Sequence, residues 1–193
     1  MTIRGFIIST FLSYCSLALG QSLQNGKQAH LFTPVSPSIS NVDFVNTLKT
    51  GEGLNILDYY YYYNGGGVAI GDVNNDGLAD IYLTGNNTSA NQLYLNTGSL
   101  SFRNVTDSAG VAGTADWSTG VTMADINADG YLDIYVSVIS DTFGLTGTNQ
   151  LFINNRDGTF TDKAKEDGLN IKGFTSQVAF FDYDHDGDLD CFI

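Results

Sequence analysis

Short apolar runs recur from residue 68 to residue 193, separated by polar, glycine-rich segments. Val, Ile, Tyr and Phe dominate the runs, and these β-branched and aromatic residues are the ones that strands favour. Glycine-rich segments between them are typical of tight turns. The pattern predicts three pairs of short strands, at residues 68–70 with 81–83, 121–123 with 134–136, and 178–181 with 191–193.

Each pair encloses an acidic loop of nine residues with one layout. Oxygen-bearing side chains stand at loop positions 1, 3, 5 and 9, glycine stands at position 6, and the loops begin 53 and then 57 residues apart. Asn-Asp-Gly clusters also occur in ordinary turns, but three copies in one register favour an ion site. The loops are residues 72–80, 125–133 and 182–190.

We predict three Ca²⁺ sites, one in each loop. Ca²⁺ takes several oxygen ligands in a flexible cage, and glycine lets the chain turn sharply around the ion. Ligation by oxygen alone argues against zinc, and the flexible loop argues against magnesium. The predicted ligands, with a backbone carbonyl at position 7, are Asp72, Asn74, Asp76, Leu78 and Asp80; Asp125, Asn127, Asp129, Tyr131 and Asp133; and Asp182, Asp184, Asp186, Asp188 and Asp190.

The residues after the loops exclude an EF-hand. An EF-hand has a bidentate Glu at position 12 and a helix on each side. Position 12 is Leu83, Val136 or Ile193 here, inside the apolar runs. Each site is therefore predicted to have the order strand, calcium loop, strand.

The segments between the loops repeat as well. Residues 91–96, Asn-Gln-Leu-Tyr-Leu-Asn, match residues 149–154, Asn-Gln-Leu-Phe-Ile-Asn. Each is followed by a turn and another short strand, at 101–105 and 159–161. One repeat therefore carries about four strands, a pattern that predicts an all-β structure of β-propeller blades.

Residues 41–193 resemble the FG-GAP/VCBS repeat family, through the three loops and the segments that repeat between them. The resemblance implies calcium-loop blades of the kind that build the propeller of integrin α subunits. Residues 63–74, Tyr-Asn-Gly-Gly-Gly-Val-Ala-Ile-Gly-Asp-Val-Asn, are similar to bacterial proteins that pair these repeats with an ASPIC/UnbV domain. That group is in turn similar to cartilage acidic protein.

The repeat divides this region into about two complete blades and a partial third. The expected blades are residues 64–116, 117–173 and the incomplete 174–193. A closed ring of seven blades, which the family suggests, would need about 400 residues at this repeat length. We therefore expect an open fragment of a larger propeller, part of a longer chain, with exposed edge strands that favour association.

The N-terminus predicts a signal peptide over residues 1–20. A short positive segment, an apolar segment at 6–19 and the small residues Ala18 and Gly20 match that pattern. Cleavage would leave a polar tether at residues 21–40 on an extracytoplasmic protein, secreted or at the cell surface. A lipoprotein signal at Cys15 is the alternative, although Tyr14 is bulky for one.

The formal net charge of −13 is concentrated in the loops. They hold eleven of the 21 acidic residues, and the other ten nearly balance eight Lys and Arg. No basic patch is available to bind nucleic acid, and no segment is long enough for a transmembrane span. No nucleophile, base and orienting group come together around His30 or His185, so we expect no catalytic residue and no enzyme activity.

Four smaller features carry structural expectations. Residues 42–46 are predicted to form a first strand. The five tyrosines at 59–63, treated as a strand, are expected to pack in the core or between blades, with a sugar or protein contact as the alternative. Glycines 65–67 indicate close backbone approach or positive φ. Cys191, the one cysteine left after cleavage, is expected to be a buried small hydrophobe.

Two functions fit these observations. The first is a calcium-stabilised module for adhesion, surface assembly or recognition of a protein or glycan ligand. The second is the propeller scaffold of a larger extracytoplasmic enzyme or glycan-binding protein, whose active part lies beyond residue 193. The sequence does not distinguish a regulatory from a structural role for calcium.

Overall fold

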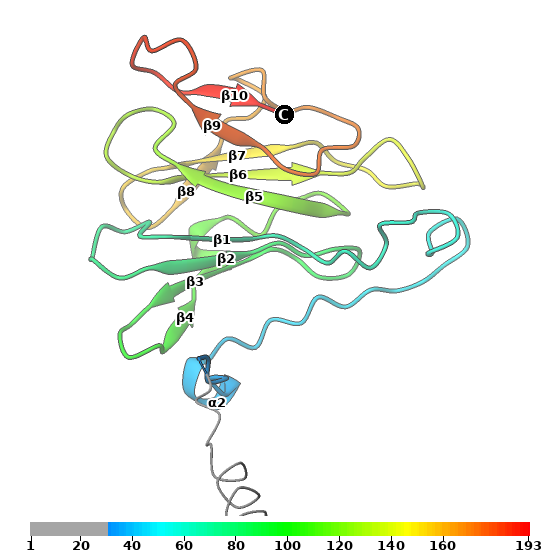
Figure 1. Cartoon of the computed structure of the whole chain (residues 1–193), viewed down its shortest axis with the longest axis horizontal. Coiled ribbons are helices and arrows are strands. Elements are labelled where there is room, and N and C mark those ends of the chain that lie inside the picture. The colour runs from blue at the N-terminus through cyan, green and yellow to red at the C-terminus, as the bar shows by residue number, and fades with distance from the viewer. Residues whose placement is uncertain (1–30) are drawn as a thin grey trace, which may run out of the picture. The chain divides into compact units, whose positions relative to one another are not determined.

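The computed structural model describes residues 31–193 (Figure 1). The predicted signal peptide and the first half of the predicted tether, residues 21–30, lie outside the described residues, as do Cys15 and His30. Residues 36–193 form one unit, which begins with a single helical turn, α2 (Pro37–Ser40), capped by the Ser36 side chain. Within residues 31–193, no helix has the length and apolar character needed to cross a membrane.

The first sheet has four antiparallel strands in chain order. They are β1 (Val68–Gly71), β2 (Asp80–Leu83), β3 (Gln92–Asn96) and β4 (Phe102–Asn104). Gly71 pairs with Asp80, so the first acidic loop closes the hairpin between β1 and β2. After β4 the chain makes a short helix, α3 (Thr106–Ala109), that the sequence pattern did not predict.

The second sheet repeats this arrangement. Its strands are β5 (Ser118–Ala124), β6 (Asp133–Val138), β7 (Gln150–Asn154) and β8 (Phe160–Asp162). A two-stranded third sheet follows, with β9 (Ala179–Phe181) and β10 (Asp190–Phe192). Each acidic loop joins the first and second strands of its sheet, so the predicted order of strand, loop, strand is confirmed.

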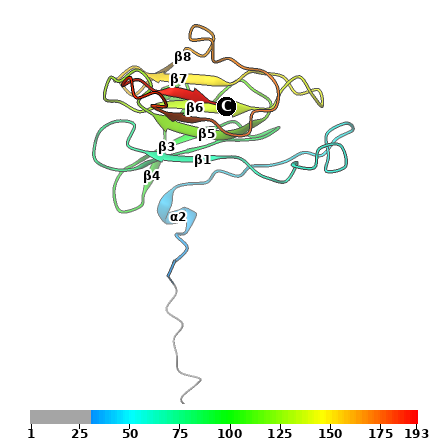
Figure 2. The same cartoon turned by 45° about the horizontal axis from the view of Figure 1, so that its top comes forward.

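The three sheets stack through their first strands, β1, β5 and β9, which lie side by side (Figure 1 and Figure 2). Alternate residues of β6 face opposite sides, as the strand period requires. Ile134 and Val136 pack in the cluster with Tyr82 of the first sheet, whereas Tyr135 packs with Val178 ahead of the third sheet. The prediction of propeller-type blades is confirmed, and residues 36–193 form an open stack.

A tyrosine in the second strand of each complete sheet anchors the segment that leaves that sheet. The Tyr82 hydroxyl donates to the Val111 carbonyl at 2.6 Å, and the Tyr135 hydroxyl donates to the Leu169 carbonyl at 2.8 Å. Burial raises the pKa of both phenols, to about 12 for Tyr135. Both hydroxyls therefore remain protonated donors at neutral pH, and each fixes the path of the chain toward the next blade.

Glycines allow the first strands to approach one another closely. A Cβ atom on Gly67 would lie 2.6 Å from the Thr119 carbonyl oxygen of the second blade. The Gly120 amide donates to the Ser176 carbonyl at 3.0 Å, which joins the second blade to the third. The expectation of close backbone approach at glycines 65–67 is confirmed, and Gly65 also has a positive φ of 79°.

The five tyrosines form turns rather than a strand, so that part of the expectation is wrong. Tyr59 and Tyr62, three residues apart, are buried against Trp117, whereas Tyr60, Tyr61 and Tyr63 are exposed. The spacing of the buried pair follows helical-turn geometry, because three residues make nearly one turn. The packing part of the expectation is correct for these two rings, which join the entry segment to the second blade.

The predicted first strand at residues 42–46 is also wrong. Side chains attach this segment to the first blade in place of ladder hydrogen bonds. The Tyr94 hydroxyl donates to Asp43 at 2.9 Å, and the Asn86 amide donates to the Asn46 side chain at 2.9 Å. Asp and Asn side chains compete with regular pairing in this way.

Cys191 is half-buried in the cluster between the second and third sheets. Its neighbours there include Tyr135 and Val178. Burial raises the pKa of its thiol, so the side chain behaves as a small, protonated apolar group.

We predict that Gly67→Ala destabilises the fold although its backbone conformation suits alanine. The added methyl would press on the Thr119 carbonyl, and overpacking of this kind costs about 1 to 3 kcal/mol. Thermal unfolding followed by circular dichroism should show a melting temperature lower by several degrees. Gly51→Ala is the matched control, because no described residue lies within 4 Å of its added methyl. Equal melting temperatures for the two variants would contradict the close approach of the first two blades.

Candidate metal centre

The three acidic loops lie at one end of the stacked sheets. Residues 72–79, 125–132 and 182–189 follow β1, β5 and β9, at the left of Figure 1. Position 4 of each loop has a left-handed backbone, with φ of 57° at Asn75, 56° at Ala128 and 63° at His185. The glycine at position 6 also has positive φ, between 86° and 99°. The sharp turn expected from the loop sequence is therefore confirmed in all three copies.

In the first loop the predicted ligand side chains fold inward over the backbone. Asp72 accepts hydrogen bonds from the amides of Asp76 at 3.1 Å and Gly77 at 2.7 Å. Asn74 also accepts from the Asp76 amide, and Asp76 accepts from the Leu78 amide at 2.9 Å. Positions 1, 3 and 5 thereby converge on one side of the turn, and the last bond fixes the peptide at position 7.

The second loop repeats these bonds. Asp125 accepts from the amides of Asp129 and Gly130, each at 2.8 Å. Asn127 accepts from the Asp129 amide at 3.1 Å, and Asp129 accepts from the Tyr131 amide at 2.9 Å. Two loops of different sequence at positions 2, 4, 7 and 8 thus share one geometry, because the oxygen side chains determine it.

The aspartate at position 9 joins its loop to the third strand of the sheet. Asp80 is fully buried, and its two oxygens accept from the Val73 amide at 3.0 Å and the Asn96 amide at 2.8 Å. Burial raises the pKa of Asp80, and the two amide hydrogen bonds act in the opposite direction. A buried carboxylate is costly unless it is hydrogen-bonded or paired with a cation.

Asp133 has the same role in the second sheet. It is fully buried and accepts from the Ile126 amide at 3.0 Å and the Asn154 amide at 2.8 Å. Burial raises its pKa as well. In the third loop Asp190 accepts from the Tyr183 amide at 2.8 Å.

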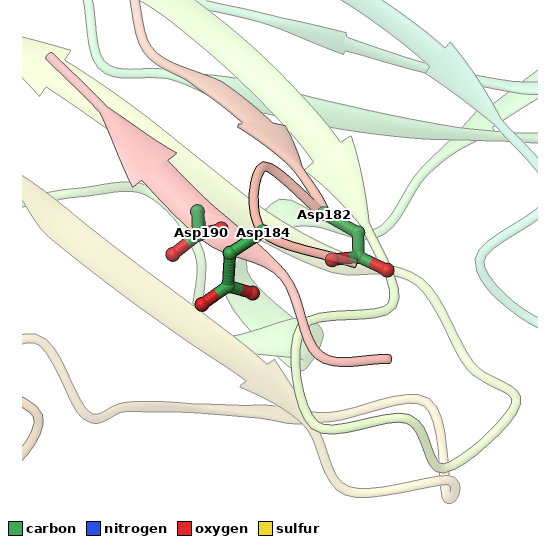
Figure 3. A group of neighbouring side chains, drawn as sticks. All are labelled: Asp182, Asp184 and Asp190. Carbon is green, nitrogen blue, oxygen red and sulfur yellow. The ribbon is translucent and has the colours of Figure 1, made fainter. Parts of the chain in front are cut away.

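The third loop brings three carboxylates together. Asp182, Asp184 and Asp190 each offer an oxygen within 4.8 Å of the others (Figure 3). Among residues 31–193 this is the one group of three acidic, histidine or cysteine side chains so close together; the other loops have Asn74 and Asn127 at position 3. One Asp182 oxygen is buried and, within the described residues, accepts no hydrogen bond. An oxygen in that state fits a cation ligand.

The other two aspartates of the third loop repel each other. Asp186 raises the pKa of Asp188 through a hydrogen bond and through its charge. Conversely, the hydrogen bond from the Asp188 amide lowers the pKa of Asp186. Like charges this close favour a shared proton or a bound cation.

The second loop has a positively charged side chain beside it, that of Arg156, which the sequence pattern did not predict. Arg156, in the turn between β7 and β8, contacts Asp129 at 2.9 Å and lies 5.8 Å from the centre of the Tyr131 ring. Partial burial acts to raise the pKa of Asp129, but the arginine and the Tyr131 amide together lower it. The predicted strand order could have indicated this contact. The third strand of the blade, β7, runs antiparallel to β6 and so returns toward the second loop, which places the turn after β7 beside that loop.

His185 is exposed at position 4 of the third loop, beyond the inward-facing side chains. The predicted carbonyl ligands at Leu78, Tyr131 and Asp188 all follow the glycine of their loops. In each case the amide of that residue donates to the position-5 aspartate. The structure therefore gives the three position-7 peptides one arrangement.

A comparison with family models supports the repeat assignment. The model of the FG-GAP-like repeat matches residues 72–136 and 138–193, which is more than half of the chain. The first match begins at the first acidic loop and runs through β5 and the second loop into β6, and the second match contains β9, the third loop and β10. No curated protein matches the chain. The match and the strand order agree, and the chain belongs to the FG-GAP repeat family.

Proposed function

We propose that this FG-GAP repeat protein is a calcium-stabilised interaction module, with one Ca²⁺ in each loop. The observation that carries the proposal is the third loop, where three carboxylates converge and one Asp182 oxygen is buried with no hydrogen bond from any residue of 31–193. All candidate ligands are oxygens, and the loops turn at glycine, which is the chemistry that Ca²⁺ selects. When bound, the ion would neutralise the carboxylates and hold the loop to its strands.

The charge distribution supports a need for cations. Eleven aspartates lie within the three loops, and within residues 31–193 only Asp129 among them has an ion pair. Repulsion among the other carboxylates opposes folding of each loop at neutral pH. A divalent cation removes that repulsion and contributes binding free energy to the folded state.

The proposed biological role is a scaffold for adhesion or surface recognition outside the cytoplasm. The N-terminal segment, with the pattern of a signal peptide, supports that location. Extracellular calcium sites commonly operate at millimolar calcium. A protein or glycan ligand would bind to the rigid stack of blades.

Calorimetry tests the proposal directly. We expect the chelator-treated chain to bind three Ca²⁺ ions, one for each loop, with dissociation constants of about 10⁻⁴ to 10⁻³ M or tighter. Asp72→Ala, Asp125→Ala and Asp182→Ala should each lower the stoichiometry by one. Absence of binding at millimolar Ca²⁺ would rule out the proposal.

Stability provides an independent prediction at the third loop. Asp184→Ala should lose the stabilisation that Ca²⁺ gives this site, about 2.7 kcal/mol when free Ca²⁺ is a hundred times the dissociation constant. In chelator the same variant should unfold close to the melting temperature of the unmodified chain, because loss of the Asp184 carboxylate also relieves repulsion among the carboxylates of the loop. Thermal unfolding in both conditions measures the difference.

The matched control is His185→Asn in the same loop. Asn occupies the equivalent left-handed position in the first loop, so this change keeps the backbone and removes no ligand. It should leave the calcium-dependent stabilisation intact. Equal losses for Asp184→Ala in calcium and in chelator would mean that Asp184 acts without a metal.

A further inference from the structure

A cavity of about 580 Å³ lies at the end of the first strands opposite the acidic loops. Three segments line most of it: residues 59–67 ahead of β1, residues 117–120 at the start of β5, and residues 174–177 ahead of β9. We call it the inner pocket. Its volume is within the range of about 300 to 1,000 Å³ that is common for small-molecule sites.

Two exposed aromatic rings form one side of the inner pocket. Tyr61 is 62% exposed and Phe174 is 61% exposed. Buried rings hold them in place: the Tyr59 ring centre lies 5.9 Å from that of Tyr61 and 6.0 Å from that of Phe174, and Tyr59 also contacts Trp117 edge to face. The pocket therefore has flat apolar surfaces that are accessible and fixed.

Uncharged polar groups also line the inner pocket. Asn64, Thr119, Ser176 and Gln177 line the pocket, and none of its lining residues is acidic or basic. Within residues 31–193, the Asn64 side chain and the Ser176 hydroxyl make no hydrogen bond, so both are available to a ligand. The side-chain amide of Gln177 donates a hydrogen bond to the Thr122 hydroxyl at 2.9 Å.

Hydrogen bonds between blades make the base of the inner pocket rigid. The Thr119 hydroxyl donates to the Thr175 carbonyl at 2.6 Å, and the Thr119 carbonyl accepts from Thr84 at 2.6 Å. The Gly120 amide donates to the Ser176 carbonyl at 3.0 Å. A site that is ordered before binding loses little conformational entropy when a ligand enters.

We propose that the inner pocket binds a neutral carbohydrate. The apolar face of a sugar ring would stack on Tyr61 and Phe174, and its hydroxyls would pair with Asn64 and Ser176. An acidic polysaccharide would meet a chain of net charge −13 with no basic residue in the lining. An apolar peptide side chain would leave the polar groups unpaired. No loop carboxylate lines the pocket, so this inference stands apart from calcium binding.

Trp117 is the single tryptophan of the chain and lines the pocket, so its fluorescence reports on ligand entry. The probes are neutral oligosaccharides of glucose, mannose, galactose and N-acetylglucosamine, added to the whole chain in millimolar Ca²⁺. We expect a saturable change with at least one of them. Tyr61→Ala and Phe174→Ala should each weaken that binding about tenfold, which corresponds to about 1.4 kcal/mol, within the range of about 0.5 to 1.5 kcal/mol for a stacked aromatic contact.

The matched control is Tyr60→Ala. Tyr60 belongs to the same turn and is 84% exposed, but it does not line the pocket. It should keep the original affinity, and circular dichroism should show that all three variants fold. No saturable change with any probe would overturn the proposal. So would unchanged affinity in both Tyr61→Ala and Phe174→Ala, or competition by an apolar peptide and not by the sugars.

Discussion

Each complete blade depends on the hydrogen bonds that the carboxylate at the ninth loop position accepts. In the two complete blades it is fully buried, and its two oxygens join an amide of the loop to an amide at the end of the third strand. Burial of a carboxylate is unfavourable without such partners, so the loop cannot move away without exposing unpaired amides. One side chain therefore fixes the loop, the first hairpin and the third strand together.

The same carboxylates concentrate negative charge in each loop. The loop places a buried carboxylate next to two or more others, and hydrogen bonds from amides offset only part of the electrostatic cost. In the second loop Arg156 supplies one positive charge. In the third loop, five aspartates have no ion pair within the part of the chain that the structure describes, and one Asp182 oxygen accepts no hydrogen bond there, so the negative charge is larger than in the other two loops. The three loops thus share their backbone turn and differ in how much negative charge remains without a positive partner.

The same strands separate the acidic loops from the inner pocket. Each first strand begins beside the inner pocket and ends at an acidic loop, so the two features lie at opposite ends of β1, β5 and β9. Glycines bring these strands together, and the hydroxyls of Thr84 and Thr119 join one blade to the next. No loop carboxylate lines the pocket, so the strands connect the two features and the loops do not contact a ligand there directly.

Much of this fold is predictable because its signals are local. Every strand of the two complete sheets overlaps a predicted run, although β5 and β6 extend beyond theirs, and the loop turns follow from glycine at position 6. The tyrosine turn, the course of residues 42–46 and the ion pair of Arg156 with Asp129 are not predictable in this way, since each depends on a partner more than 25 residues away. The inner pocket has the same origin. Trp117 and Phe174 occupy equivalent places in successive repeats, but only the stacking of blades brings them to one cavity.

The most direct test of calcium binding is X-ray diffraction from crystals grown with Ca²⁺, recorded at a wavelength where calcium scatters anomalously. The proposed calcium binding requires three anomalous peaks, one in each loop. Oxygens of loop positions 1, 3, 5, 7 and 9 should lie about 2.3 to 2.6 Å from each peak. Loops that keep the same conformation with no peak, at calcium concentrations well above a millimolar, would contradict it.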